Sequence, residues 1–200
     1  MPRRSSATHR PISTPPRIPC IGDADADGYD DLLCLWPVGG IADISLNARG
    51  EKAVFHTQAR TDFGTGGLGA ACGRFTACKG AGLMTVLPDG SVRLASETDE
   101  SGNHFRRDDN LGKLPGKPKP PVKMTAGDVD GDGYDEAIVL DATGRVFLID
   151  VEGQAPPKAV MGMIGRVAPG TIAIATGDFE GTGKAVLVYP GSVEAWTESL

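Results

Sequence analysis

Short apolar runs recur along the chain, and each is followed by a turn and a second run in which apolar and polar residues alternate. The first runs read LLCLW, LMTVL, AIVL and AVLVY, and three of them precede the turns PDG, DATG and PG. The runs after these turns read SVRLA, RVFLID and SVEAW. Short runs that are rich in β-branched residues and bounded by Gly, Pro and Asp are typical of β-strands. The pattern therefore predicts an all-β protein.

The same unit occurs four times at nearly equal intervals. Each copy begins with a glycine and a loop ahead of its first apolar run, and the copies start at Gly22, Gly73, Gly127 and Gly177. Residues 51–64, EKAVFHTQARTDFG, supply further strand candidates in the first unit. Strand-rich repeats with a period of about 50 residues suit a β-propeller, in which each repeat forms one four-stranded blade.

Two of the four loops are strongly acidic. Residues 22–33 read GDADADGYDDLL, and residues 127–140 read GDVDGDGYDEAIVL. Because like charges at short range repel each other, carboxylates crowded in this way need a compensating positive charge. Ca²⁺ takes about six to eight oxygen ligands in flexible geometry, so it suits such a loop. We therefore expect one calcium ion at each of the two loops.

These loops resemble the FG-GAP or VCBS repeat of integrin-like β-propellers. The calcium loop of that family reads D-x-[DN]-x-[DN]-G-x-x-[DE] and leads directly into a strand, and both acidic loops match it fully. Residues 177–188 match in part, and residues 73–87 match only in their frame. The resemblance covers about residues 20–200. It implies a calcium-binding propeller, commonly of seven blades, which at about 50 residues each need more chain than this. The four units would form either a small four-bladed ring or an arc of a larger propeller.

The spacing of the acids and the resemblance assign the same metal ligands. A tight loop points alternate side chains inward, and Gly133 permits the sharp turn because it lacks a Cβ. Asp30 and Asp135, which precede the closing acids, are expected to point outward. The expected ligands are Asp23, Asp25, Asp27, the Tyr29 carbonyl and Asp31 in the first loop, and Asp128, Asp130, Asp132, the Tyr134 carbonyl and Glu136 in the third.

Two alternative interpretations of the acidic loops remain open from the sequence. An EF-hand loop begins in the same way, but it needs a Glu at its twelfth position and a helix after the loop. The twelfth positions are Cys34 and Val139, and strand-like residues follow. The other alternative is a solvated acidic turn that binds no metal.

The remaining two loops lack the full set of acids. The fourth, DFEGTGKAV at residues 178–186, keeps Asp178, Glu180 and Thr182 but has Val186 at the expected closing position, so weak calcium binding or none is expected. In the second unit the three ligand positions are Arg74, Thr76 and Cys78. That loop is not expected to bind calcium.

Four cysteines stand at positions 20, 34, 72 and 78, and they allow three connectivities. Cys20 and Cys34 flank the first calcium loop, and Cys78 takes a ligand position in the second loop, just after Cys72. The hypothesis is a pair of local disulfides, Cys20–Cys34 and Cys72–Cys78. The second disulfide would hold its loop in the conformation that a metal ion holds in the acidic loops. Such bonds imply an oxidising compartment. The alternative is four reduced thiols in a cytosolic protein.

Charge is distributed unevenly along the chain. Residues 1–19 hold four arginines and no acid, so the net charge of −6 leaves −10 on the rest. This first segment is rich in Pro, Ser and Thr, lacks the apolar centre of a secretory signal, and is expected to be a disordered leader. The fold is expected over residues 20–200. An acidic body argues against nucleic acid as a partner, and no apolar run is long enough to span a membrane.

Together these features favour a recognition module over an enzyme. The resemblance implies adhesion or recognition, with a protein or glycan ligand, structural calcium, and an extracellular or cell-surface location. A second copy of the chain is a further expected partner if one chain does not close the ring. An enzyme, or an accessory domain such as those attached to polysaccharide lyases and hydrolases, is the alternative. Only His9, His56 and His104 are present, and no catalytic set can be placed from spacing.

Overall fold

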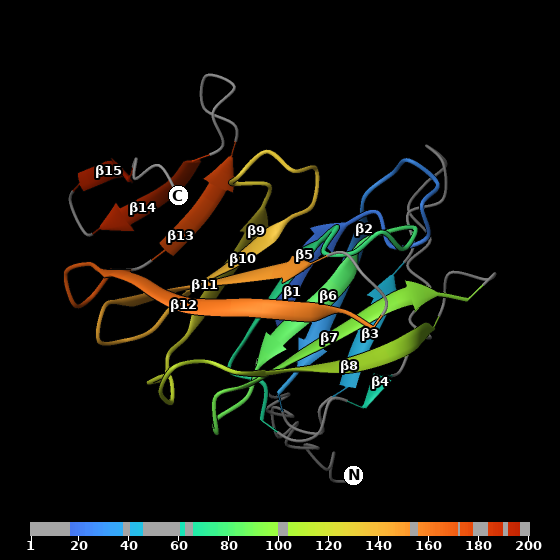
Figure 1. Ribbon diagram of the computed structural model, residues 1–200, viewed down its shortest axis with the longest axis horizontal. Helices are drawn as coiled ribbons and strands as arrows, with labels where there is room; N and C mark the ends of the chain where they lie inside the picture. Colours follow the sequence, from blue (N-terminus) through green and yellow to red (C-terminus); the bar gives the residue numbers. More distant parts are fainter. Residues whose placement is uncertain are drawn as a thin grey trace, which may run out of the picture.

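The computed structural model describes residues 17–37, 41–45, 61–62, 66–99, 104–152, 156–171, 173–177, 184–189 and 192–196. The regular structure in these ranges consists of β-strands, which confirms the all-β prediction. The strands form four separate antiparallel sheets, one for each repeat of the sequence (Figure 1). The described strands form no closed barrel or closed propeller ring.

Each sheet is a meander in which consecutive strands pair with each other. The first sheet contains β1 (Ile18–Gly22), β2 (Asp31–Trp36), β3 (Ile41–Ser45) and β4 (Thr61–Asp62). The second contains β5 (Gly69–Gly73), β6 (Gly82–Val86), β7 (Ser91–Thr98) and β8 (Phe105–Lys113). The third contains β9 (Lys123–Gly127), β10 (Glu136–Leu140), β11 (Arg145–Glu152) and β12 (Lys158–Arg166), and the fourth contains β13 (Ala173–Gly177), β14 (Lys184–Tyr189) and β15 (Ser192–Trp196).

Each structural unit begins one strand earlier than the repeat seen in the sequence. The glycine that starts each sequence repeat is the last residue of the first strand, so the loop joins the first strand to the second. Strand β1 therefore includes Ile18 and Pro19, from the segment that the sequence assigns to the leader. Of the strand candidates over residues 51–64, Thr61–Asp62 form β4, and the other residues lie outside the described ranges.

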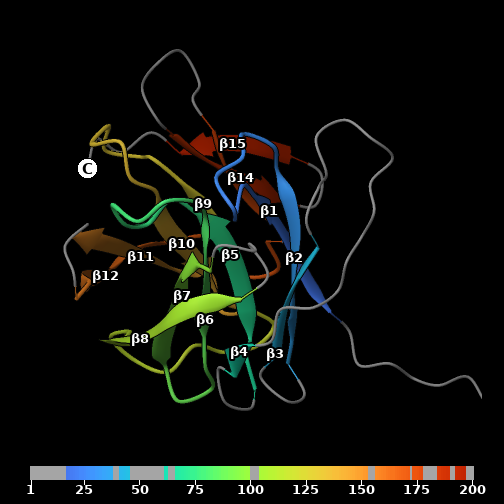
Figure 2. The ribbon, with the colours of Figure 1, turned by 90° about the vertical axis from the view of Figure 1, so that its right-hand side faces the viewer.

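The first strands of the four sheets lie side by side. Strand β5 packs beside β1, β9 packs beside β5, and β13 packs beside β9 (Figure 1). In the view of Figure 2 the first sheet, in blue, stands next to the second, in green. The sheets thus follow one another in chain order with their faces in contact.

An apolar core fills each boundary between successive sheets. The core between the first and second sheets includes Leu33, Leu35 and Leu83, none of which is exposed to solvent. The second sheet buries its other face, with Met84 and Val86, against the third. Strands β6 and β10 are consequently buried on both faces, and this explains why their sequences are continuous apolar runs rather than alternating ones.

The pairing register corrects the expected closing position of the fourth loop. Gly22 pairs with Asp31, and Gly127 pairs with Glu136, so the predicted closing acid is the first residue of the second strand. In the fourth sheet Gly177 pairs with Lys184. The connection is therefore two residues shorter than in the other units, and Lys184, not Val186, stands where a closing carboxylate would be. The loop itself, residues 178–183, lies outside the described ranges.

Candidate metal centres

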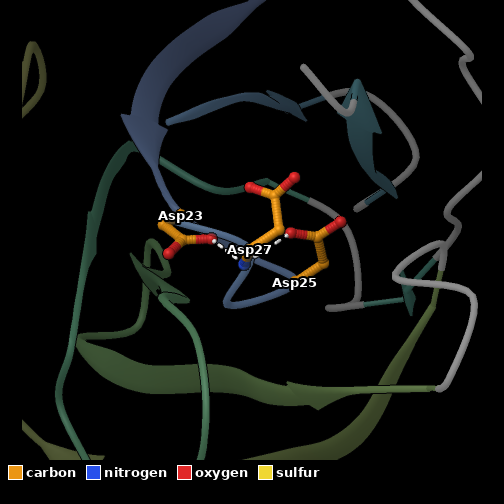
Figure 3. Close-up of side chains that lie close together, drawn as sticks. All are labelled: Asp23, Asp25 and Asp27. Atoms are coloured by element: carbon orange, nitrogen blue, oxygen red, sulfur yellow. Dashed lines mark hydrogen bonds between the residues drawn. The ribbon is translucent and has the colours of Figure 1, made fainter. Parts of the chain in front are cut away.

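Each acidic loop gathers three carboxylates around one point. In the first loop one oxygen from each of Asp23, Asp25 and Asp27 lies within 4.8 Å of the others (Figure 3). The third loop groups Asp128, Asp130 and Glu136 in the same way. Oxygen atoms at such separations can share one cation, because Ca²⁺ binds its oxygen ligands at about 2.3–2.6 Å.

Backbone hydrogen bonds within the third loop hold its aspartates in place. Asp128 accepts from the amides of Gly131 and Gly133, at 2.7 Å and 3.0 Å. Asp130 accepts from the Asp132 amide at 3.0 Å, and Asp132 accepts from the Tyr134 amide at 2.8 Å. Each carboxylate therefore has a fixed direction before any ligand arrives, which lowers the entropy cost of binding a metal.

The first loop repeats this arrangement almost residue for residue. Asp23 accepts from the amides of Asp27 and Gly28, both at 3.0 Å, and Asp25 also accepts from the Asp27 amide, at 3.1 Å. Figure 3 shows the Asp27 amide between the two carboxylates. Asp27 in turn accepts from the amide of Tyr29 at 2.9 Å. The two loops thus share a backbone conformation as well as a sequence.

Backbone angles confirm the role expected of the turn glycine. Gly133 has a φ of 91°, and its counterpart Gly28 has the same value. Two positions earlier the chain again adopts a positive φ, 86° at Gly131 and 61° at Ala26. This conformation costs a residue with a Cβ about 1 kcal/mol, so the first loop carries a small strain that the third loop avoids.

The closing acids are the most deeply buried carboxylates of the two loops. Asp31 and Glu136 are each 2% exposed. Each accepts a hydrogen bond from the amide of the second loop residue: Asp31 from Ala24 at 2.9 Å, and Glu136 from Val129 at 2.7 Å. A carboxylate has two oxygens with about four acceptor positions, so an acid that accepts from an amide can also face a cation.

Electrostatics around the third loop show how poorly its acids are compensated. Burial, together with the charges of Asp130 and Asp132 and against the lowering effect of the hydrogen bond from the Val129 amide, raises the pKa of Glu136 to about 7. Burial, followed by the charges of Asp31 and Asp27, likewise raises the pKa of Asp25 in the first loop. A bound divalent cation would relieve this repulsion, so the donor set fits a metal.

Strand β11 contributes an acid that sequence reasoning missed. Burial and the charges of Asp130 and Asp132 raise the pKa of Asp150. Ile149 pairs with Ala137 across the sheet, so the next residue, Asp150, lies beside Glu136. Asp150 lies outside the loop motif, so only the register of strand pairing could have indicated its position beside Glu136.

The structure brings together only part of each predicted ligand set. Asp31 is absent from the closest group in the first loop, and Asp132 is absent from that in the third. The side chain of Tyr29 is 47% exposed. The Tyr134 ring lies under the Arg74 guanidinium, 5.6 Å from the ring centroid. Both tyrosines were expected to contribute only their carbonyls, so these ring positions leave that expectation open.

The predicted disulfide pairing is wrong. Cys20 and Cys72 form a disulfide, with their Cα atoms 5.6 Å apart, and neither Cys34 nor Cys78 forms one in the described part of the chain. The reason is that β1 and β5 lie side by side, so residues far apart in sequence meet across the boundary between two sheets. The Cys20–Cys72 disulfide links two repeats and does not close a single loop.

The second loop, which lacks acids, is held by other contacts. Phe75 is 1% exposed and anchors the loop in the core shared by the second and third sheets. The Arg74 amide donates to the Asp135 carboxylate at 2.6 Å, and the Asp135 amide donates to the Arg74 carbonyl at 3.0 Å. Asp135 therefore points away from its own acidic cluster and towards the second loop. Asp30, at the same position in the first unit, is exposed, as the sequence led us to expect.

Comparisons with known proteins add no family to this description. No family model matches the chain, and no curated protein matches it. In the described residues, no helix has the length and apolar character needed to cross a membrane.

Proposed function

We propose that the protein is a calcium-stabilised repeat protein of the FG-GAP or VCBS type, in which propeller-like blades form a recognition module for a protein or glycan. The observation that carries this proposal is the pair of carboxylate clusters at equivalent positions in two repeats. Two acidic clusters in the same loop of two repeats are difficult to explain as unrelated surface acids. The order of the sheets, with their first strands side by side, supports propeller-like packing.

Calcium is the metal that the donors favour. All side-chain donors are carboxylate oxygens, which suit hard cations and not the softer transition metals. Mg²⁺ demands a smaller, near-octahedral cage and gives up its water reluctantly, whereas a loop of backbone turns offers flexible geometry. We expect about two calcium ions per chain, one at each complete loop.

The role of the metal would be structural. The first loop is tied to the second sheet by a hydrogen bond from the Ala81 amide to the Asp23 carbonyl, at 2.6 Å. The third loop is tied to the second sheet through Asp135 and Arg74. A cation that fixes the two acidic loops would therefore also fix the boundaries between the first three sheets.

The recognition role rests on the resemblance and on a hollow beside the loops. This hollow has a volume of about 530 Å³ and lies among the first three loops. Its lining combines apolar side chains with both charges, including Asp30, Arg74 and Lys79. Such a surface offers donors and acceptors to the polar groups of a peptide or sugar. The Cys20–Cys72 disulfide is compatible with an extracellular location, which we propose for the protein.

Thermal unfolding with and without calcium tests the stabilising role. At a free calcium concentration of about 100 times the dissociation constant, each occupied site should add about 2.7 kcal/mol to the free energy of unfolding. Asp128→Ala and Asp23→Ala should each remove the calcium-dependent stabilisation that one site contributes. Asp108→Asn, on β8, removes a carboxylate that pairs with Arg93 and belongs to neither acidic cluster, so this variant should keep the full calcium response. Equal stabilisation by magnesium would contradict the assignment.

A glycan array probed with the calcium-loaded, labelled protein tests the recognition role. Selective binding of one glycan class, weakened by charge removal at Lys79 or Arg74, would support the proposal. If no glycan binds, a peptide library displayed under the same conditions tests the protein ligand. Failure of both would contradict the recognition role and leave the calcium role standing.

A further inference from the structure

The contact between successive sheets uses equivalent residues at different boundaries. Between the first and second sheets the Ala81 amide donates to the Asp23 carbonyl at 2.6 Å, and between the second and third the Asp135 amide donates to the Arg74 carbonyl at 3.0 Å. In both cases the last loop residue of one unit donates to the first loop residue of the unit before it. The boundary is therefore a repeated interface.

Side chains of the first strands follow the same rule. We call the residue two before the starting glycine the forward position, because its side chain meets the next sheet. The residue one before that glycine is the backward position, whose side chain meets the preceding sheet. The forward–backward pairs are the disulfide Cys20–Cys72, the alanines Ala71 and Ala126, which belong to the same apolar core, and Thr125 with Thr176, whose hydroxyl oxygens lie 3.1 Å apart.

The first sheet leaves its backward position exposed. Cys20 bonds to the second sheet, and a Cβ on Gly22 would lie 2.9 Å from Ala81, so both residues face that sheet. Since side chains alternate along a strand, Ile21 points the opposite way, and it is 65% exposed. Asp30, at the loop position from which Ala81 and Asp135 donate, is exposed as well.

The fourth sheet leaves its forward position exposed. Ile174 is 9% exposed and belongs to the core shared with the third sheet, and Thr176 contacts Thr125 of that sheet. Ala175 lies between these two residues and points away from the third sheet, where it is exposed. The exposed side of β13 therefore corresponds to the forward side of the first strands in the other three sheets. The exposed side of β1 corresponds to their backward side.

We infer that these two open faces dock on each other between two copies of this chain, head to tail. The evidence for a second copy comes from the three boundaries within one chain, where a forward position meets a backward position. One face exposes an unused backward position, and the other exposes an unused forward position. Strand β13 packs on β9, and among the described strands no comparable packing joins it to β1. A head-to-tail contact that closes makes a ring.

Site-specific cross-linking tests the pairing of Ile21 with Ala175. In a background with Cys34→Ser and Cys78→Ser, Ile21→Cys and Ala175→Cys chains are mixed under mild oxidation. A disulfide-linked pair of chains containing one of each is expected. Replacing Ala175→Cys with Val160→Cys, at an exposed position on β12, should give at least ten times less product. If the chain carrying both Ile21→Cys and Ala175→Cys instead forms its bond within one monomer, the second copy is ruled out.

Light scattering on the unmodified chain gives a second test. The expected mass is twice that of one chain, and Ile21→Asp should weaken the dimer at least tenfold. Val160→Asp is the matched control, since Val160 is 60% exposed and lies on an outer strand. A monomer at all concentrations, or equal weakening by both variants, would overturn the inference. Both tests measure association between chains and not metal binding, so failure here is distinct from failure of the proposed metal sites.

Discussion

Asp135 and Arg74 are joined by two hydrogen bonds across the boundary between the second and third sheets. The Asp135 carboxylate accepts from the Arg74 amide at 2.6 Å, and the Asp135 amide donates to the Arg74 carbonyl at 3.0 Å. One acidic loop thereby supports a neighbouring loop that has no acids of its own. The second loop has a positive φ at Gly80 and not at its fourth and sixth positions, so these contacts hold a turn that differs from that of the acidic loops.

Removing this carboxylate should loosen the second loop. Asp135→Ala leaves the Arg74 amide without its acceptor, at a cost of about 1 kcal/mol in the free energy of unfolding. Asp135→Asn keeps a side-chain oxygen at the same place and should cost less. Urea unfolding of the three proteins measures the difference. Equal stability of the alanine variant and the parent would show that the contact does not contribute.

The link between the first two sheets should be a major source of stability. Cys20 and Cys72 are 52 residues apart, so loop-closure entropy gives about 4 kcal/mol for their disulfide. The double variant Cys20→Ser with Cys72→Ser should lose most of this amount, and reductant should lower the melting temperature of the parent. Cys78→Ser is the control and should change little. Peptide mapping that recovers Cys20–Cys34 would refute the pairing.

The strain at the fourth residue of the first loop predicts opposite effects at two equivalent positions. Ala26→Gly should stabilise the protein by about 0.5–1 kcal/mol, because glycine accepts a positive φ without a Cβ clash. Gly131→Ala should destabilise it by a similar amount. No atom lies within 4 Å of a Cβ placed on Gly131, so backbone conformation alone is responsible. Melting curves recorded in chelator should show the two shifts, and shifts of the same sign would contradict this explanation.

A buried ion pair in the third sheet should make stability depend on pH. Burial raises the pKa of Asp141, but hydrogen bonds from Thr143, Arg145 and the Lys119 amide outweigh it and lower the pKa to about 2. Because the folded pKa lies below the ordinary value of 3.8, the stabilisation is complete above pH 4 and is lost as the pH falls towards 2.

The variant Asp141→Asn isolates this contribution. Its deficit relative to the parent should be on the order of 2 kcal/mol at pH 6 and should narrow steadily between pH 4 and pH 2. Urea unfolding at several pH values measures it. A deficit that stays constant over this range would mean that the charge of Asp141 is not responsible.

Features that short stretches of sequence determine were predictable. The apolar runs of the second strands, the turns and the four loop positions all follow from short stretches of sequence, and the positive φ of Gly133 was expected from its place in the loop. The first strands were missed because IPCIG, GAACG and KMTAG contain Gly or Pro and show no clear alternation. Only their packing beside one another defines them.

Features that depend on packing between sheets were not predictable. The Cys20–Cys72 bond and the position of Asp150 beside Glu136 both require the register of strands that are distant in the sequence. A local interpretation of the cysteines led to the wrong pairs for this reason. The shorter fourth loop was hidden in the same way, since only the pairing of Gly177 with Lys184 reveals it.

Titration calorimetry with calcium on chelator-stripped protein tests the central claim most directly. The result predicted is about two sites per chain, with a clear preference over magnesium. Asp23→Ala and Asp128→Ala should each abolish one site and leave the other intact. Fewer than one site per chain, or equal affinity for the two metals, would contradict the assignment of both acidic loops.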